Sequence, residues 1–409
     1  MQEAWPIAGF SPLAGMRVLD FSKVIAGPLC AQYLGDMGAD VIKIEPCGRG
    51  DDTRHWPPFV EDVGTIFLAV NRNKRSLAID LKSPEGRDII RRLVPRCDVV
   101  LESFGPGVTE RLGIGYDALK TLNPGLVYCS VSGYGTKGPM KDAKGYDLIA
   151  QAFSGMMSIT GEKDGPPMRS PFSPVDQGTG LHAVIAILGA LLQRTRTGEG
   201  MKLETSLFDT AVGFLSYYLQ GYWSHGKEPE RHGAGHESLC PYQAFDTADK
   251  PVILGIANDA LWVAFCEVAG VPELARDPRF LTGGARVANR AETVARVQDI
   301  MRRHTRADWL TILGARAIPC VPVNTLGELA RHPQLDASDL VLEYRSGSGA
   351  PRKTVAAPVR AGGARMALRT PPPRLGEHSR AILTELGLSA DVLADLGRRG
   401  IVAFDPAAP

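Results

Sequence analysis

Long hydrophobic runs, paired cysteines and an excess of one charge are all missing from this 409-residue sequence. Its 46 basic side chains nearly balance 45 acidic ones, so no net field attracts nucleic acid or an anionic membrane. The N-terminus lacks the basic stretch and apolar run of a signal peptide. We therefore expect a cytoplasmic protein that binds neither nucleic acid nor membrane.

The seven cysteines are scattered and form no Cys-x-x-Cys pair. This gives no sign of a transition-metal site and favours reduced, packed thiols. The longest apolar run, residues 181–192, is too short to span a bilayer and predicts a buried helix. We expect His182, which lies in that run, to be a packed core histidine.

The first half of the chain alternates short apolar strands with helical segments. One helix start is explicit at 83–96, where Ser83 precedes Pro84 at the first turn. This order predicts an α/β fold with a parallel sheet covered by helices. A Gly-, His- and Pro-rich stretch at 224–245 leads to a second unit with one strand and several helices. The strands expected in the first half are 16–21, 40–46, 75–81, 98–103 and 125–134.

The turn after the first strand lacks a dinucleotide-binding fingerprint. Glu45 ends the second strand as a ribose-binding acid would, but residues 22–28 read Ser-Lys-Val-Ile-Ala-Gly-Pro instead of G-x-G-x-x-G. This argues against a dinucleotide, and we expect no tightly bound cofactor. Free amides at the helix start remain for another ligand.

Basic residues gather around the third strand. On composition they are either solvated strand ends or phosphate ligands, in which Lys acts as a point charge and Arg as a fork. Residues 102–116 add a flexible Gly-Pro-Gly turn and Arg111. The basic residues of the third strand are Arg72, Lys74, Arg75 and Lys82.

Residues 231–238 form a Gly- and His-rich stretch. His232 and His236 have no third ligand in view, so no metal site is predicted. We interpret Gly233 and Gly235 as parts of a flexible lid that closes over substrate.

Asp176 stands where a proline-rich loop meets the apolar helix. Loops that place ionisable groups near a helix start are typical of active sites. By spacing alone, Asp176 fits a helix N-cap, bonded to the amide of Gly178 or Thr179, better than a nucleophile. The roles are compatible, because helix-start amides keep a carboxylate ionised. Other ionisable groups of this region are Lys144, Tyr146, Asp147 and Arg169.

Matching motifs run in order through roughly three quarters of the chain. They are LAGMRVLDFSKVIAGPLCAQYLGDMGADVIKIEP, NRNKRSLAIDLKSPEGRDIIRRL, DVVLESFGPGVTERLGIGYDAL, NPGLVYCSVSGYGTKGP, GYDLIAQAFSGMMSITGEKDGPPMR, DQGTGLHAVIAILGALLQRTRTGEGMKLETSLFDTA, APVR and LGEHSRAIL. Together they resemble the class III CoA-transferase family, the group of carnitine CoA-transferase and formyl-CoA transferase.

This resemblance implies an α/β protein with two domains. A large Rossmann-like, CoA-binding domain would comprise residues 1–220 and 330–409, and a smaller α/β domain would comprise 221–329 with the mobile Gly-rich loop. Two chains would thread through one another as an interlocked ring homodimer. Coenzyme A would be a substrate and carrier, with an acyl-CoA and a free carboxylate as the reaction partners.

The resemblance also implies site residues, with Asp176 as the nucleophile. Those at CoA would be Val24, Ile25, Ala26, Ile79, Lys82, Ser103, Phe104, Gly105, Arg111, Lys144 and Tyr146. Pro46 stands where the family often has a basic residue. The adenosine phosphate would then depend more on Lys82, Arg72 or Arg75. Residues expected at the acyl substrate or lid are Asp147, Arg169, Gly233, Gly235 and His236.

The family's chemistry requires a carboxylate. Attack of Asp176 on an acyl-CoA gives a mixed anhydride and CoA thiolate, and the thiolate then forms a thioester on Asp176 that an acceptor carboxylate opens. Water must be excluded, which suits a closing loop at 233–238. The amides of Gln177 and Gly178 would stabilise the oxyanion. Gly178 and Gly180 would leave room for the thioester.

Two alternatives stay open. The α-methylacyl-CoA racemase branch uses a His and an Asp as two bases. Its histidine would fall on Tyr146, and a phenol, with an ordinary pKa of about 10, is a poor base at neutral pH. A non-catalytic CoA-binding protein is the third possibility, and the polar loop kept together with Asp176 argues against it.

The substrates follow from two further features. The short loop at 233–238 lacks a long polyglycine insertion, which argues against formyl and oxalate substrates. Arg169, His232 and His236 suggest pairing with a second carboxylate. We therefore expect a dicarboxylate pair with succinyl-CoA as donor.

Overall fold

A computed structural model describes residues 10–346 and 348–406 of the chain. They divide into two compact units, each with its own hydrophobic core. The large unit comprises the described residues up to Ser154, Pro171–Ser216 and those from Gln334 onward. The small unit comprises Gly155–Ser170 and Tyr217–Pro333.

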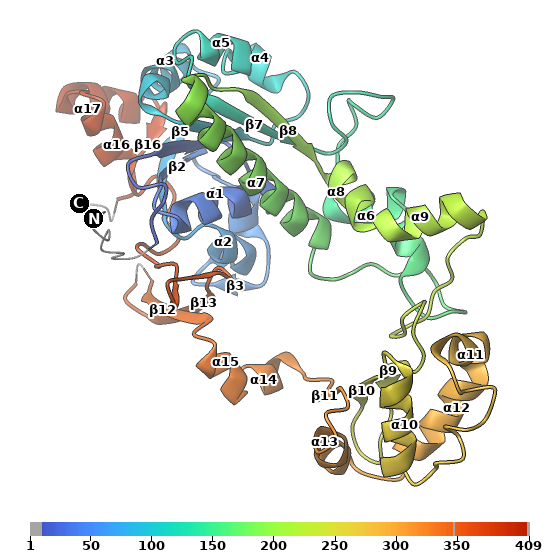
Figure 1. Ribbon diagram of the computed structural model, residues 1–409. Coiled ribbons are helices and arrows are strands. Elements are labelled where there is room, and N and C mark those ends of the chain that lie inside the picture. The colour runs from blue at the N-terminus through green and yellow to red at the C-terminus, as the bar shows by residue number, and fades with distance from the viewer. Residues whose placement is uncertain (1–9, 347, 407–409) are drawn as a thin grey trace, which may run out of the picture. The chain divides into compact units, whose positions relative to one another are not determined.

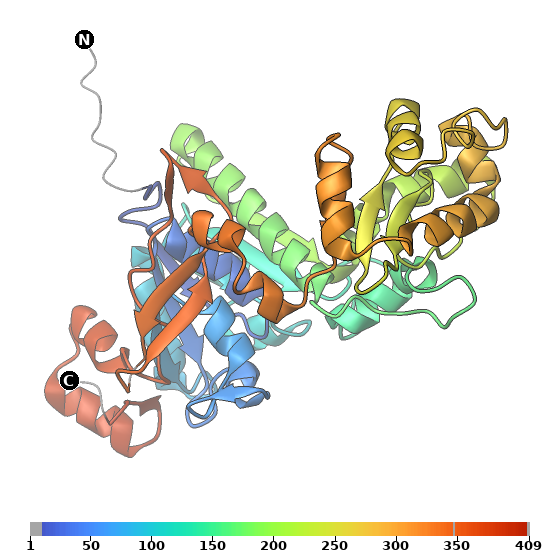
Figure 2. The ribbon, with the colours of Figure 1, turned by 90° about the horizontal axis from the view of Figure 1, so that it is seen from below.

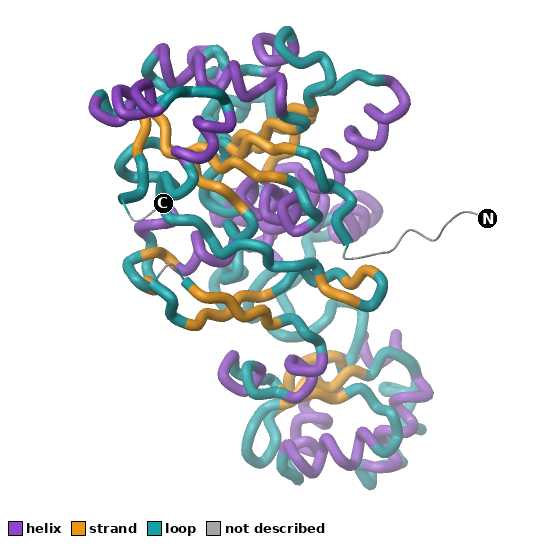
Figure 3. The backbone as a smooth tube through the Cα atoms, turned by 90° about the vertical axis from the view of Figure 1, so that its left-hand side faces the viewer, coloured by secondary structure: helices purple, strands orange, loops and turns teal. Residues whose placement is uncertain are grey.

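The large unit is built on a seven-stranded sheet in the order β16-β5-β2-β1-β6-β7-β8 (Figures 1 and 3). All neighbouring strands are parallel except β16, which pairs antiparallel with β5 at one edge. The parallel strands follow the order of a doubly wound Rossmann sheet, which confirms the predicted α/β fold with a mostly parallel sheet. The strands are β1 (Arg17–Asp20), β2 (Asp40–Glu45), β5 (Lys74–Ile79), β6 (Val99–Glu102), β7 (Val127–Ser132), β8 (Lys202–Ser206) and β16 (Val402–Ala403).

Helices cover both faces of this sheet (Figure 3). On one face α3 buries Ile89, Ile90 and Leu93 against strand residues such as Leu19 and Ile42. The Ser83 hydroxyl accepts the N–H of Gly86 at 3.0 Å, and Pro84 begins the helix, as predicted. On the other face α1 (Ala26–Asp36) and α7 (Pro174–Thr197) lie side by side (Figure 1). The helices of the first face are α3 (Pro84–Leu93), α5 (Tyr116–Lys120), α16 (Ser379–Glu385) and α17 (Ala390–Arg398).

Helix α7 (Pro174–Thr197) contains the apolar run and has one exposed face. By length and composition it is the one helix in the described residues that is able to cross a membrane, and 56% of its apolar window is buried inside the chain. Ile185 is 67% exposed and Leu192 59% exposed, so the predicted burial is right for only part of the helix. His182 is also exposed, and its Nδ1 lies 3.0 Å from the Thr210 hydroxyl, so the predicted core position is wrong.

The remaining elements of the large unit are the helix α1 and a set of shorter helices and strands. The Pro- and Arg-rich tail forms an antiparallel hairpin, seen as two orange strands in Figure 2. Gly387, with φ of +87°, separates α16 from α17. The elements are α1 (Ala26–Asp36), η1 (Asp52–His55), β3 (Phe59–Val60), β4 (Val63–Gly64), α2 (Thr65–Val70), η2 (Val94–Arg96), α4 (Val108–Leu112), α6 (Asp147–Phe153), α8 (Leu207–Phe214), β12 (Val341–Arg345), β13 (Pro351–Val355), β14 (Arg360–Ala361) and β15 (Ala364–Arg365).

The small unit has a three-stranded antiparallel sheet in the order β11-β10-β9. Trp262, Phe265 and Trp309 form the centre of its core. All seven cysteines of the chain are free thiols, as predicted. The elements are η3 (Met156–Ile159), β9 (Tyr242–Phe245), β10 (Val252–Gly255), α10 (Asp259–Val268), α11 (Gly283–Ala288), α12 (Arg290–Met301), α13 (Arg306–Gly314), β11 (Cys320–Pro322) and α14 (Leu326–Leu329), with α9 (Ser216–His225) and α15 (Pro333–Ala337) at the boundaries.

Candidate active site

A cavity of about 250 Å³ lies in the large unit beyond the carboxyl ends of β1, β6 and β7. Neighbouring strands β1 and β6 form the point where the order of the sheet reverses, which is where open α/β sheets bind their ligands. The cavity is lined by residues 23–27, 103–106, 131–133, 141, 143–146, 176 and 207.

Most of the residues that the sequence places at CoA line this cavity. They come from three separate segments that the sheet brings together, after β1, after β6 and before α6. Asp176 lines the same cavity from the first turn of α7. The predicted residues found here are Val24, Ile25, Ala26, Ser103, Phe104, Gly105, Lys144 and Tyr146.

Two predicted phosphate ligands have partners inside the fold. The Arg72 guanidinium is buried and donates to both carboxylate oxygens of Asp36, at 3.0 and 2.6 Å. The Arg75 guanidinium donates to Asp40 and to Glu385. Because these contacts occupy both forks, the structure argues against their role as adenosine-phosphate ligands.

The other predicted CoA residues lie outside the cavity lining. Ile79 is a buried core residue on β5, 1% exposed, and it pairs with Val402 of the edge strand β16, so the structure argues against its role as a CoA contact. Lys82 and Arg111 are exposed, each on a segment that follows the carboxyl end of a strand. Both remain candidates for the phosphate groups of CoA.

The helix start at Asp176 is capped by a different carboxylate. Asp176 is the third residue of α7, after Pro174, and the N-cap position belongs to Ser173. Asp147 Oδ2 accepts the N–H of Val175 at 2.9 Å and that of Asp176 at 3.1 Å. In the described residues no donor bonds to the Asp176 side chain. The predicted capping by Asp176 is therefore wrong, because Asp147 has taken the free amides.

The environment of Asp176 favours its protonated form. Burial raises the pKa of Asp176 to about 7, and the neighbouring Asp147 carboxylate adds to the rise. Burial disfavours a charged carboxylate, and a second negative charge disfavours it further. The prediction that helix amides keep Asp176 ionised is thus wrong. A carboxylate that titrates near neutral pH in a cavity is typical of a reactive group.

The glycines after Asp176 serve packing. A Cβ at Gly178 would lie 2.3 Å from the ring of Phe214, and one at Gly180 would lie 2.6 Å from the carbonyl oxygen of Ala26. The prediction that they leave room for the thioester is therefore wrong. Gly180 lets the turn after β1 touch α7 one helical turn beyond Asp176.

Four predicted substrate or lid residues belong to the small unit, whereas Asp147 and Asp176 belong to the large unit. Arg169 is exposed. Gly233 donates its N–H to the Gly161 carbonyl at 2.9 Å, and Gly235 bonds back to His232 at 2.7 Å. His236 accepts the N–H of Ser238 at 3.1 Å. A role for Arg169, Gly233, Gly235 and His236 at the substrate stays a prediction.

Sequence reasoning missed several residues of the site. Lys23 and Lys141 line the cavity. Lys141 adds positive charge to that of Lys144, whereas Lys23 forms an ion pair with Asp52 at 3.1 Å. Lys23 directly precedes the predicted contact Val24, which was a usable signal. The capping role of Asp147 had no local signal, since its partners lie beyond an intervening loop.

Comparisons with known proteins agree on one family. The profile described as CoA-transferase family III matches residues 13–379. The chain is 40% identical to succinyl-CoA:glutarate CoA-transferase of Mus musculus, over 92% of this chain and 86% of that protein. It is 39% identical to succinate–glutarate CoA-transferase of Agrobacterium fabrum, over 92% and 96%. A crystal structure of a CAIB/BAIF family protein from Brucella suis aligns with a TM-score of 0.82 at 38% identity, over 92% and 99%.

Proposed function

Because the chain belongs to CoA-transferase family III, it is a CoA-transferase, and we propose that it moves CoA from succinyl-CoA or another dicarboxylyl-CoA to a free dicarboxylate through Asp176. One observation carries the proposal. Asp176 lines the same cavity as the expected CoA residues from the segments after β1, after β6 and before α6. It is 9% exposed, so a bound acyl-CoA would complete its separation from water.

The reaction uses Asp176 as the nucleophile. Its carboxylate attacks the thioester carbonyl, the C–S bond breaks, and CoA leaves as thiolate from an acyl–aspartyl anhydride. The thiolate attacks the aspartyl carbonyl and releases the donor acid, which leaves an aspartyl-CoA thioester. An acceptor carboxylate repeats these steps in reverse order and restores Asp176 with a new acyl-CoA. Each step exchanges one activated acyl bond for another, so the energy of the thioester is conserved as long as water is excluded.

The raised pKa of Asp176 fits this chemistry. A carboxylate poorly stabilised by its surroundings attacks a carbonyl more readily than one held by several donors. Near neutral pH a substantial fraction of Asp176 is ionised. The backbone amides of Ala26 and Gly27 begin α1 at the cavity and lack a side-chain cap, which supports their use on a developing oxyanion or phosphate.

The choice of dicarboxylates rests on charge and on relatives. Lys141 and Lys144 line the same cavity as Asp176 and suit a CoA pyrophosphate or a second substrate carboxylate. The mouse and Agrobacterium relatives are named for succinate and glutarate. We extend this preference to the chain and assign Arg169 and His236 to the distal carboxylate.

Three family features complete the proposal. The large unit binds CoA, and the loop at 233–238 closes over the substrates. The chain forms an interlocked ring homodimer. The exposed apolar row of α7 supports an interface, because Leu181, Ile185 and Leu192 repeat at helical spacing and are 41%, 67% and 59% exposed.

A substrate panel tests the proposed function. Purified protein is incubated with succinyl-CoA and one free acid at a time, and new thioesters are read by mass. Glutarate and other dicarboxylates of similar length are expected to accept CoA, while butyrate and oxalate should be poor acceptors. Transfer to monocarboxylates with none to any dicarboxylate would contradict the proposed specificity. Exchange of an α-deuterium of the acyl-CoA with solvent, as the sole detectable activity, would point to racemase chemistry instead.

A further inference from the structure

We propose that Asp51 is a positioning residue for acyl-CoA, which acts by holding the turn between β1 and α1, residues 22–27, in its ligand-binding shape. The inference rests on the proposed function, since this turn lines the cavity that contains Asp176. Asp51 itself precedes the short helix η1 and does not line that cavity. It is 3% exposed.

The turn has an unfavourable backbone at its centre. Val24 adopts φ of +72°, in the left-handed region. A β-branched residue in this region is a genuine outlier, and such residues persist only where the surrounding structure over-determines them. Something must therefore hold Val24 there.

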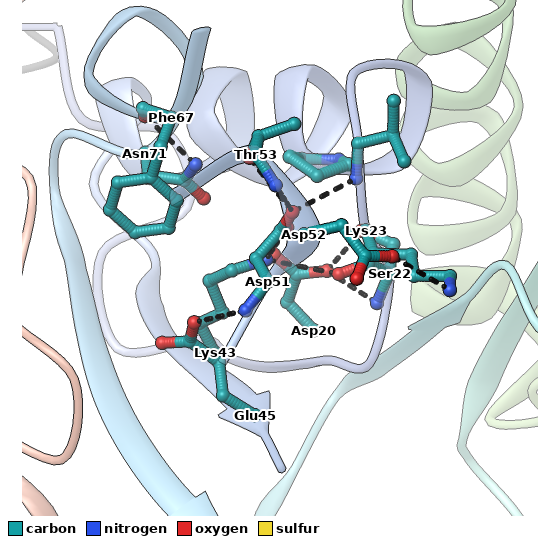
Figure 4. Close-up of polar contacts among 12 residues, drawn as sticks. Asp20, Ser22, Lys23, Lys43, Glu45, Asp51, Asp52, Thr53, Phe67 and Asn71 are labelled. Atoms are coloured by element: carbon teal, nitrogen blue, oxygen red, sulfur yellow. Dashed lines mark hydrogen bonds and ion pairs between the residues drawn. The ribbon is translucent and has the colours of Figure 1, made fainter. Parts of the chain in front are cut away.

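Asp51 and Lys43 supply this restraint through contacts with the backbone of the turn. Asp51 Oδ1 accepts the N–H of Val24 at 3.4 Å and both donors of Thr53, at 2.9 and 2.8 Å. Asp51 Oδ2 forms an ion pair with Lys43 Nζ at 3.0 Å, and Lys43 donates to the carbonyl of Ser22 at 3.0 Å. One buried pair thus reaches the turn on both sides of Lys23. Figure 4 shows Asp51 between Lys43 and Thr53.

A second pair braces the same turn. Asp20 Oδ1 accepts the N–H and hydroxyl of Ser22, and Asp20 Oδ2 pairs with Lys74 at 2.9 Å. Lys74 also donates to the carbonyl of Pro28 in the first turn of α1 at 2.8 Å. Asp20, Asp51, Lys43 and Lys74 carry balanced charge and are all at most 3% exposed.

Stability alone does not explain such a cluster. Replacement of a buried ion pair by apolar side chains of similar size is often neutral or stabilising. The pairs in this cluster have their polar atoms directed at the backbone of a strained turn that meets the ligand. The geometry therefore assigns them to placing the turn, with Asp51 as the residue that contacts Val24.

The test separates positioning from folding. Asp51→Ala is expected to raise KM for succinyl-CoA, and the Kd of CoA by calorimetry, about tenfold (on the order of 1.4 kcal/mol), with kcat at saturation within about twofold. The matched control is Asp36→Ala, which breaks the buried ion pair between Arg72 and Asp36. Asp36 lies at the end of α1 opposite to the turn. Asp36→Ala should lower Tm and leave KM and Kd unchanged.

A charge-balanced double variant keeps the inference falsifiable if Asp51→Ala folds poorly. Lys43→Met with Asp51→Leu removes both charges, so Tm should recover toward wild type. KM and Kd should stay raised, because Val24 and Ser22 have lost their partners. Wild-type KM and Kd in the double variant, or an equal rise in Asp36→Ala, would overturn the inference. If the wild-type protein transferred no CoA but bound it, the function would fail while the Kd comparison still decided the role of Asp51.

Discussion

Asp147 Oδ2 lies 3.1 Å from the backbone nitrogen of Asp176 and accepts its N–H, so one carboxylate caps the helix that carries the other. The contact fixes the first turn of α7 and brings a second negative charge close to Asp176. Both carboxylates are largely buried, at 7% and 9% exposure. This arrangement gives Asp176 a fixed position and a raised pKa at once.

Removing the charge of Asp147 should shift the pH dependence of the reaction. Asp147→Asn retains an oxygen that accepts the amides of α7. It removes the negative charge that, in addition to burial, raises the pKa of Asp176. Asp176 must be ionised to attack, so the wild-type kcat/KM is expected to rise with pH around 7. In Asp147→Asn the rise of kcat/KM with pH should occur at lower pH. An unshifted rise would show that the Asp147 charge does not reach Asp176.

Neutralising Asp176 should stabilise the fold in a pH-dependent way. Its pKa is raised from 3.8 to about 7, so the folded protein retains a proton that the unfolded chain releases between these values. Wild-type stability therefore falls as pH rises through this window. The gain in Tm of Asp176→Asn should grow from about pH 4 to pH 7 and then level off. A Tm difference that is constant with pH would contradict the assigned pKa.

A methyl group at Gly180 should displace the β1–α1 turn. Its Cβ would lie 2.6 Å from the Ala26 carbonyl, a backbone atom with little freedom to move. Gly180→Ala is therefore expected to lower Tm and to raise KM for acyl-CoA several-fold. Gly213 lies in the helix α8 with nothing within 4 Å of its Cβ position, so Gly213→Ala is the matched control. It should leave KM unchanged and add up to about 1 kcal/mol of helix stability. Equal KM values in the two variants would refute the contact.

Five strands of the sheet, β1, β2, β5, β6 and β7, were predictable because they are mostly buried and their sequences are rich in apolar residues. The edge strands β8 and β16 were not predicted, and β8 exposes Lys202 and Glu204. The start of α3 was predictable for a similar reason, because its signals, Ser83 and Pro84, are adjacent in sequence to the first turn of the helix. The cavity followed from the family motifs around β1 and β6. These features depend on short stretches of sequence.

The features that sequence reasoning missed depend on tertiary packing. Asp147 caps α7 only because α6 packs beside it. The sequence pattern predicted Arg72 and Arg75 as phosphate ligands. In the fold they form ion pairs with Asp36 of α1 and Asp40 of β2. No periodicity in the sequence pairs these groups. Glycine is likewise required at position 180 because the carbonyl of Ala26, on another helix, packs against it.

A charge on the exposed row of α7 should prevent assembly of the proposed homodimer. Ile185 is 67% exposed in the single chain, and Ile185→Glu would place an unpaired carboxylate in an apolar interface. Sedimentation velocity is expected to show a dimer for wild type and smaller species for Ile185→Glu. Gln193→Glu, at an exposed polar position of the same helix, should remain dimeric. A dimer in all three proteins would exclude this row from the interface.

The central claim is that Asp176 carries CoA during transfer. Trypsin cleaves after Arg169 and Arg194, and within the peptide 170–194 Asp176 is the only acidic side chain. Protein treated with succinyl-CoA alone, quenched in acid and digested, should yield this peptide with CoA attached, and addition of glutarate before the quench should remove the adduct. Asp176→Asn should bind CoA but give neither adduct nor transfer. Transfer by that variant at the wild-type rate, or transfer by wild type with no adduct ever found on this peptide, would contradict the account.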